Sequence, residues 1–185
     1  MEHEDLNRLA ERTLILRCQL GDEIAFERLV SKYHRRLRYF VRELVGPAGS
    51  AEDVLQEVWV TVYRRIATLR QPEAFVAWMY RIARHKVYHA IRKPAHVELV
   101  EDCAIPSHED KENILDRYEA AQIHAAMRLL RPEHREVLIL RFFEEMAYSD
   151  IAETVGCQIG TVRSRLHIAK KRLREHLERA DSHEQ

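Results

Sequence analysis

Residues 148–166 read YSDIAETVGCQIGTVRSRL, and this stretch decides how the C-terminal part of the chain folds. Two helices that cross closely need a small residue at the crossing, a turn residue that tolerates a positive φ angle, and an apolar anchor in the second helix. Ala152, Gly156 and Val162 supply these at offsets of four and then six residues. The remaining core positions are apolar: Ile151, Val155 and Leu166. The spacing predicts a helix-turn-helix unit.

The second helix of this unit is strongly basic, with no acidic residue from Gln158 to Arg174. Basic side chains contact phosphates, and arginine or serine near the start of a recognition helix reaches base edges. The alternative is a solvated basic helix near the chain end. We expect DNA contacts from Thr161, Arg163, Ser164, Arg165, His167, Lys170 and Lys171.

Composition favours helices throughout the chain. The 185 residues include only five glycines and five prolines, and the formal net charge is zero. Few helix breakers among many Leu, Ala, Arg and Glu predict an all-α fold. The length suits one ordinary domain or two small domains of roughly 70 residues each. A zero net charge hides local blocks of charge, so those blocks carry the functional information.

Three helices are predicted in the N-terminal half. The first runs from Ile24 to Leu44 and ends at the Gly-Pro pair 46–47, which cannot continue a helix. Ser50 is the expected N-cap of the second helix, and Gln71-Pro72 ends that helix. The apolar stripe of the second helix is Val54, Leu55, Val58, Trp59, Val62, Tyr63, Ile66 and Leu69. The third helix spans about residues 73–93.

Periodicity weakens after Pro94, and acidic residues dominate until helix returns at about residue 116. The sequence therefore predicts residues 1–93 and 116–185 as two helical domains, joined by an acidic linker at residues 94–115. Pro132 fits the first turn of a further helix that carries Leu140, Phe142 and Phe143.

The third predicted helix carries a second basic block, from Trp78 to Lys93, that contains no acid. Cations interleaved with aromatic rings suit unstacked or single-stranded bases, because backbone charge and ring stacking act together. An amphipathic helix with a solvated face would show the same pattern. The candidate contacts are Trp78, Arg81, Arg84, His85, Tyr88 and Arg92.

The second predicted helix has a polar face, with Asp53, Gln56 and Glu57 at i, i+3 and i+4. Acids stabilise a helix N-terminus, so one interpretation is a solvated first turn. The other interpretation is a docking patch for a basic partner. Composition leaves both interpretations open.

Together these motifs resemble the group-four, extracytoplasmic-function (ECF) sigma factors of the sigma-70 family. GDEIAF at 21–26, SAEDVLQEVW at 50–59 and FVAWMYRIAR at 75–84 are similar to region 2. DIAE at 150–153 and GTVRSRLH at 160–167 are similar to region 4. Order and spacing both match, over roughly residues 20–178.

The resemblance implies a sigma factor that binds core RNA polymerase, selects promoters and assists DNA melting, without catalysis of its own. Asp53, Gln56 and Glu57 would dock on the polymerase clamp helices. The loop at about 67–74 and the following helix would hold the melted minus-ten element, and the C-terminal recognition helix would read the minus-thirty-five element. The linker would thread toward the polymerase active centre. An anti-sigma factor is a further expected partner.

Four positions depart from the family pattern. Ala147 stands where Ser or Thr usually caps the first helix of the helix-turn-helix unit, and Ile168 stands where an arginine is common. His85 and His89 occupy positions where Asn and Asp often occur. Their spacing could share a metal ion, but no third ligand is evident nearby. We expect His85 to contact DNA and His89 to serve packing.

Other classes of protein fit less well. Cys18, Cys103 and Cys157 lack the spacing of a disulfide framework or zinc site. No signal peptide or membrane span is evident, so a cytoplasmic protein is expected. No cofactor or metal is expected either. A transcription regulator that acts without polymerase would explain only the C-terminal unit. A helical metalloenzyme would need clustered ligands, whereas the eleven histidines are scattered.

Overall fold

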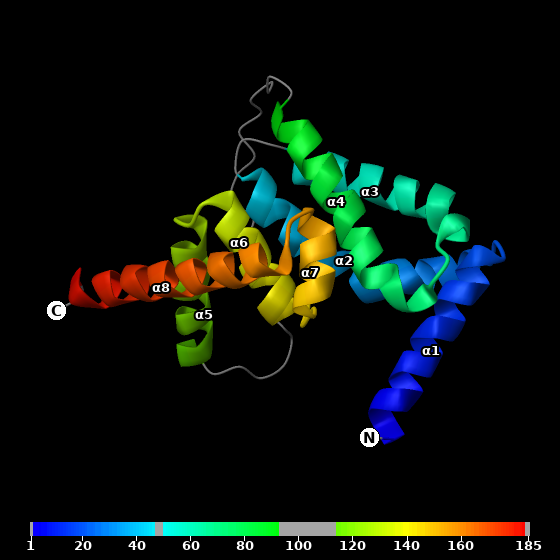
Figure 1. The fold of residues 1–185 in the computed structure, drawn as a ribbon, viewed down its shortest axis with the longest axis horizontal. Coiled ribbons are helices and arrows are strands. Elements are labelled where there is room, and N and C mark those ends of the chain that lie inside the picture. Colours follow the sequence, from blue (N-terminus) through cyan, green and yellow to red (C-terminus); the bar gives the residue numbers. More distant parts are fainter. Residues whose placement is uncertain (1, 47–49, 93–113, 184–185) are drawn as a thin grey trace. The chain divides into compact units, whose positions relative to one another are not determined.

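The computed structural model describes residues 2–46, 50–92 and 114–183, and every regular element among them is a helix or helical turn (Figure 1). The all-α prediction is confirmed. The chain divides into two compact units, one holding α1 to α4 and the other mainly α5 to α8. The predicted acidic linker and Cys103 lie outside the described residues, so the predicted domain boundaries stay predictions. No helix in the described ranges is long and apolar enough to cross a membrane.

The first unit contains four helices and two short 3-10 turns. The elements are α1 (Glu2–Gln19), α2 (Glu23–Val45), α3 (Ala51–Arg65), η1 (Ile66–Thr68), η2 (Pro72–Ala74) and α4 (Phe75–Arg92). The three predicted helices correspond to α2, α3 and α4. Helix α1 was not predicted, and it packs against α2 and both 3-10 turns.

Side-chain caps start two of these helices. The Asp22 carboxylate accepts a hydrogen bond from the Ala25 backbone N–H at 3.0 Å, at the start of α2. Ser50 Oγ accepts from the Asp53 N–H at 3.2 Å, which confirms the predicted cap of α3. Gly46 ends α2 with a φ angle of 74°, a conformation that favours glycine.

The core of the first unit forms where α2, α3 and α4 pack against one another. Helix α4 contributes five buried side chains: Phe75, Met79, Tyr80, Ala83 and Val87. The rings of Tyr80 and Phe40 meet edge to face, with centroids 5.0 Å apart. Burying a large apolar side chain contributes about 1.5–3 kcal/mol, so this contact orients α4 firmly. The opposite face of α4 is left for polar contacts.

The second unit is built from α5 (Ile114–Arg128), α6 (Pro132–Leu138), the π-helical turn η3 (Ile139–Phe143), α7 (Tyr148–Val155) and α8 (Ile159–His183). Pro132 occupies the first turn of α6, as predicted. The expected continuous helix through Phe143 widens into a π turn, in which the Glu144 N–H donates to the Ile139 carbonyl at 3.2 Å. Phe142 and Phe143 are exposed there, at 51% and 40%.

The helix-turn-helix prediction is confirmed by α7 and α8. Gly156 adopts a φ angle of 69° in the turn, where a side chain would be strained. Ala152 and Val162 are buried, as the sequence pattern required. The three other predicted core positions are buried too: Ile151, Val155 and Leu166.

The N-terminus of α7 offers a direct stability test. Ala147 precedes the helix, and its carbonyl accepts from the Ile151 N–H at 3.0 Å, but alanine has no side-chain acceptor for a cap. We predict that Ala147→Ser stabilises the second unit by about 1 kcal/mol. Hydrogen exchange of α7 and α8 amides measures this directly. Ala125→Ser, at an exposed position within α5, is the matched control and should not stabilise.

Candidate nucleic-acid and protein interfaces

An acidic patch lies on the first two turns of α3. Asp53, Gln56 and Glu57 are all exposed on one face, because the opposite face of α3 is buried. Glu57 pairs with Lys86 of α4 at 2.9 Å, and Glu52 nearby pairs with Arg38 of α2 at 2.7 Å. The structure therefore brings the three predicted docking residues together.

The same face of α3 continues as an apolar strip. Val60 is 44% exposed and Tyr63 is 51% exposed, so Tyr63 does not join the buried stripe that the sequence predicted. The Tyr63 ring instead rests edge-on against Phe26 of α2, with centroids 4.9 Å apart. This face of α3 therefore presents both acidic and apolar side chains to solvent.

The predicted basic face of α4 is only partly as expected. Arg81, His85 and Arg92 are exposed, and Trp78 is half-buried. Arg84 is drawn inward, with its guanidinium 4.6 Å from the centre of the Tyr88 ring. His89 is exposed, so the expectation that it serves packing was wrong.

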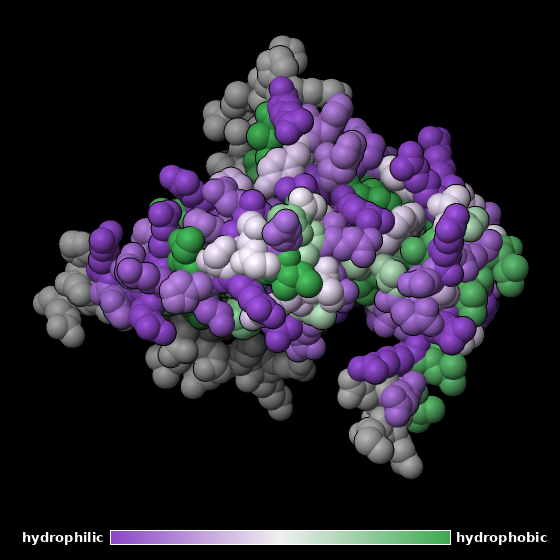
Figure 2. Space-filling view, in the orientation of Figure 1, coloured by the Kyte–Doolittle hydropathy of each residue, from purple (hydrophilic) through white to green (hydrophobic). Residues whose placement is uncertain are grey.

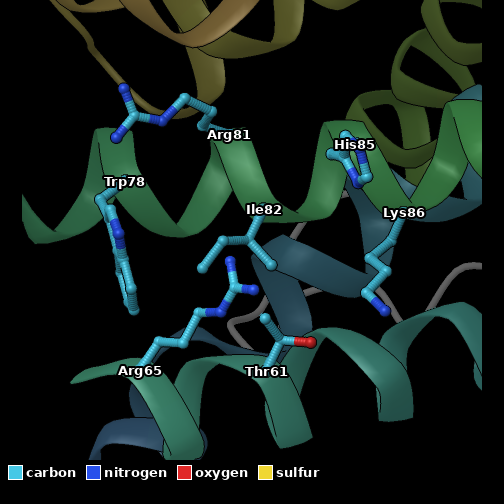
Figure 3. A pocket seen from close by; sticks show the side chains of 7 residues that line it. All are labelled: Thr61, Arg65, Trp78, Arg81, Ile82, His85 and Lys86. Carbon is cyan, nitrogen blue, oxygen red and sulfur yellow. The ribbon is translucent and has the colours of Figure 1, made fainter. Parts of the chain in front are cut away.

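A groove of about 400 Å³ lies between side chains of α3 and α4, which pack against each other (Figure 3). Its lining consists of Thr61, Arg65, Trp78, Arg81, Ile82, His85 and Lys86. Trp78, Ile82 and Lys86 extend from α4 toward α3. Arg65 reaches from α3 toward them. The groove thus combines an indole ring with several cations.

Four groove residues were not among the predicted contacts: Thr61, Arg65, Ile82 and Lys86. Arg65 and Thr61 belong to α3, and no local pattern links them to the basic block on α4. Lys86 lies inside that block, but it falls off the face defined by Arg81 and His85. Only the packing of α3 on α4 brings the two helices' cations together.

The exposed face of α8 is cationic along its first four turns. Val162, Leu166 and Ala169 are buried, so the positions between them point outward. Figure 2 shows hydrophilic side chains over much of the visible surface of this helix. The exposed members of the predicted set are Arg163, Ser164, His167, Lys170 and Lys171, while Thr161 and Arg165 are half-buried.

Some residues of α8 already have partners within the unit. Ser164 Oγ donates to the Thr161 carbonyl at 3.0 Å, and the Lys171 ammonium lies 4.0 Å from Glu175. The Lys170 ammonium lies 4.8 Å from the centre of the Phe142 ring. Ile168, the departure from the family pattern, is exposed on the same helix. The Lys171–Glu175 pair is exposed, and exposed ion pairs contribute little to stability.

Among the described side chains, no group of three or more His, Cys, Asp or Glu is placed to hold a metal ion. Cys18 and Cys157 are both free thiols. Burial raises the pKa of the Cys18 thiol above its ordinary value.

Comparison with known proteins identifies two segments. Residues 29–96 match the model of Sigma-70 region 2, and residues 120–173 match that of Sigma-70 region 4. The chain is 34% identical to the RNA polymerase sigma-H factor of Pseudomonas aeruginosa over 179 residues, covering 90% of this chain and 93% of that protein. It is 31% identical to the ECF RNA polymerase sigma-E factor of Escherichia coli over 177 residues, covering 89% and 92%.

Two solved structures share the fold. CnrH, in complex with the cytosolic domain of CnrY, superposes with a TM-score of 0.67 at 23% identity, covering 91% of this chain and 97% of that one. RpoE from Bartonella quintana, in complex with the anti-sigma factor NepR, superposes with a TM-score of 0.66 at 24% identity, covering 83% and 96%.

A buried histidine underlies the basic helix of the second unit. His134 is 7% exposed at the start of α6, which packs against α8. Burial lowers the pKa of His134, and the charges of Arg172, Arg131 and Arg165 lower it further, while Glu133 opposes them. The pKa of His124 on α5 is also lowered, by burial and by Arg128. The folded unit therefore favours both imidazoles in the neutral form.

These shifts predict that the second unit loses stability in mild acid. Below about pH 6.5 the unfolded chain takes up protons that the folded unit resists, so the free energy of unfolding falls as pH falls. Above that pH the two histidines are neutral in both states, so they do not make the free energy of unfolding depend on pH. His134→Leu should weaken the dependence of the free energy of unfolding on pH. His167→Gln, at an exposed position on α8, should leave that dependence unchanged. Both tryptophans, Trp59 and Trp78, lie in the first unit, so hydrogen exchange of α6 and α8 is the suitable measurement.

Proposed function

The chain belongs to the ECF sigma factors of the sigma-70 family, and we propose that it directs core RNA polymerase to promoters through three surfaces. The acidic patch on α3 docks on polymerase. The groove between α3 and α4 holds the melted minus-ten strand and so assists melting. The exposed face of α8 reads the minus-thirty-five element.

The groove between α3 and α4 is the observation that carries this proposal. A nucleobase freed from the duplex stacks on an aromatic ring, and each stacked base contributes about 1–3 kcal/mol. Trp78 offers such a ring, while Arg65, Arg81 and Lys86 offer charge for the adjoining phosphates. Duplex DNA keeps its bases paired, so this arrangement favours single-stranded over double-stranded DNA. We assign His85 and Arg92 to the flanking phosphates, and Arg84 to holding Tyr88 in place.

Docking on polymerase is assigned to Asp53, Gln56 and Glu57, together with the apolar strip formed by Val60 and Tyr63. A basic partner surface would gain charge complementarity at the acids and apolar burial at the strip. The Glu57–Lys86 pair has 60% and 28% exposed side chains. A pair this exposed contributes at most about 1 kcal/mol, so a partner cation can displace Lys86.

Reading of duplex DNA is assigned to α8. Arg163, Ser164 and His167 lie on the exposed face near its N-terminus, where a recognition helix contacts base edges. Lys170 and Lys171 lie farther along and suit phosphates. Thr161 and Arg165 are half-buried at the edge of this face.

Two further parts of the proposal concern partners. The acidic linker, which lies outside the described residues, would occupy a basic nucleic-acid channel of polymerase until RNA displaces it. We also propose an anti-sigma partner and action in the cytoplasm, where polymerase and promoters are found. RpoE, which shares this fold, was solved with the anti-sigma factor NepR.

Run-off transcription on fragments of genomic DNA tests the function. The chain with core polymerase should give transcripts from a small set of sites, and core alone should not. The charge-altered double variant Asp53→Lys with Glu57→Gln should abolish core binding, because it removes both acids while leaving an acceptor near Lys86. Glu52→Lys is the control on the same helix. Transcripts that persist at full level with the double variant would show that the docking assignment is wrong.

Arg163 and Lys171 of α8 separate base reading from phosphate binding. Arg163→Ala should relax sequence discrimination by about 1–3 kcal/mol if the guanidinium reads a base. Lys171→Ala should weaken binding to every duplex alike. It should also lower the slope of log affinity against log salt concentration by about one. Holoenzyme affinity for a recovered promoter and a scrambled duplex, measured against salt concentration, distinguishes the two effects. Unchanged affinity in Arg163→Ala and Arg165→Ala on both duplexes contradicts the assignment of α8.

A further inference from the structure

One side chain ties the loop at residues 66–74 to the end of α1. Gln19 Nε2 donates to the Ile66 carbonyl at 3.1 Å and to the Leu69 carbonyl at 2.7 Å. A side-chain amide nitrogen carries two N–H donors, so a single glutamine satisfies both acceptors. Gln19 is half-buried, and its acceptors follow it by 47 and 50 residues in the sequence.

The two backbone hydrogen bonds within the loop each join residues only three positions apart. The Leu69 N–H closes η1 on the Ile66 carbonyl at 3.1 Å, and the Ala74 N–H closes η2 on the Gln71 carbonyl at 3.0 Å. Leu69 between them is extended, with φ −71° and ψ 113°. Two separate 3-10 turns joined by extended residues do not form one rigid element, because 3-10 turns are short and their hydrogen bonds have poor geometry. Contacts from outside the loop must therefore set its conformation.

The end of α1 is a rigid platform for those contacts. Gly21 turns the chain with a φ angle of 84°, and the Arg17 guanidinium lies 2.6 Å from Asp22, the residue that caps α2. The pKa of Asp22 is lowered by its bonds to the Ala25 backbone N–H and to Arg17, so the cap stays charged. Ile15 and Cys18 are buried, which fixes the rotation of α1.

A second contact joins the same two segments. Arg12 of α1 lies 3.4 Å from Glu73 of η2, and both side chains are more than half exposed. Figure 1 shows the C-terminal end of α1 beside the connection from α3 to α4. Exposed ion pairs contribute little, so the Gln19 bonds are the stronger constraint on the loop.

We propose that Gln19 is a positioning residue for promoter opening, which holds the 66–74 loop in the conformation that receives the melted strand. The inference rests on the proposed function, because it assumes that this loop and α4 hold that strand. A loop ordered before binding does not lose conformational entropy when DNA arrives, so affinity for the melted strand rises. Helix α1 thereby acts on DNA through the loop, without contacting the strand at Gln19.

Two substitutions of similar length test the donors of Gln19. Gln19→Glu keeps the shape but places carboxylate oxygens against two carbonyls, whereas Gln19→Lys keeps a donor of similar reach. Asn7→Asp, at an exposed position of α1, is the matched amide-to-acid control. The full chain with core polymerase is assayed on two probes from a promoter recovered by run-off transcription. One probe is a fork with a single-stranded minus-ten segment, and the other is an upstream duplex that carries only the minus-thirty-five element.

Gln19→Glu should bind the fork roughly tenfold more weakly, with unchanged affinity for the upstream duplex and for core. Hydrogen exchange should rise at residues 66–74 in that variant. Gln19→Lys and Asn7→Asp should behave as the parent. The proposal is overturned if Gln19→Glu binds the fork like the parent, or if it loses fork and upstream duplex equally. A parent holoenzyme that does not prefer the fork to a scrambled fork would instead overturn the proposed function, and this inference with it.

Discussion

The burial of α4 against α2 and α3 is the contact on which the first unit depends. Phe75, Met79 and Tyr80 are completely buried, so α4 cannot rotate without exposing three large apolar side chains. That constraint points Arg81 and His85 outward and turns Trp78 and Lys86 toward α3. The chemistry of the groove is therefore a consequence of core packing, because the same helix supplies the core on one side and the groove on the other.

Opposite charges lie on separate helical faces, although the chain as a whole has no net charge. Acids lie on the exposed face of α3, while cations line α4 and α8. The Glu57–Lys86 pair joins the two kinds of surface within the first unit. The proposed docking surface and the proposed DNA groove therefore share one ion pair.

Two local features of the second unit, near the start of its helix-turn-helix, are unfavourable for stability. Glu145 has a φ angle of 55°, which is unfavourable for a residue other than glycine, and Ala147 offers no side-chain cap to α7. The π turn at residues 139–143 leaves Phe142 exposed near Lys170 of α8. The buried side chains Val162 and Leu166, which attach α8 to the unit, offset these costs.

Local sequence was sufficient for features that depend on neighbouring residues. The Ser50 cap, the end of α2 at Gly46 and the turn at Gly156 each follow from one residue's backbone or side-chain chemistry. The family resemblance rests on such local segments too. The assignments of individual residues to polymerase or DNA stay predictions, because nothing in the fold alone tests them.

Features that depend on distant contacts could not be read from the sequence. Helix α1 was missed because exposed leucines such as Leu6 and Leu9 obscure its buried side. Tyr63 fitted the apolar stripe of α3, yet the packing of that helix leaves it exposed against Phe26. Arg65 joins the groove only because α3 lies against α4. Helical periodicity specifies which residues share a face, but the neighbour that covers each face is chosen by the packing of segments far apart in the chain.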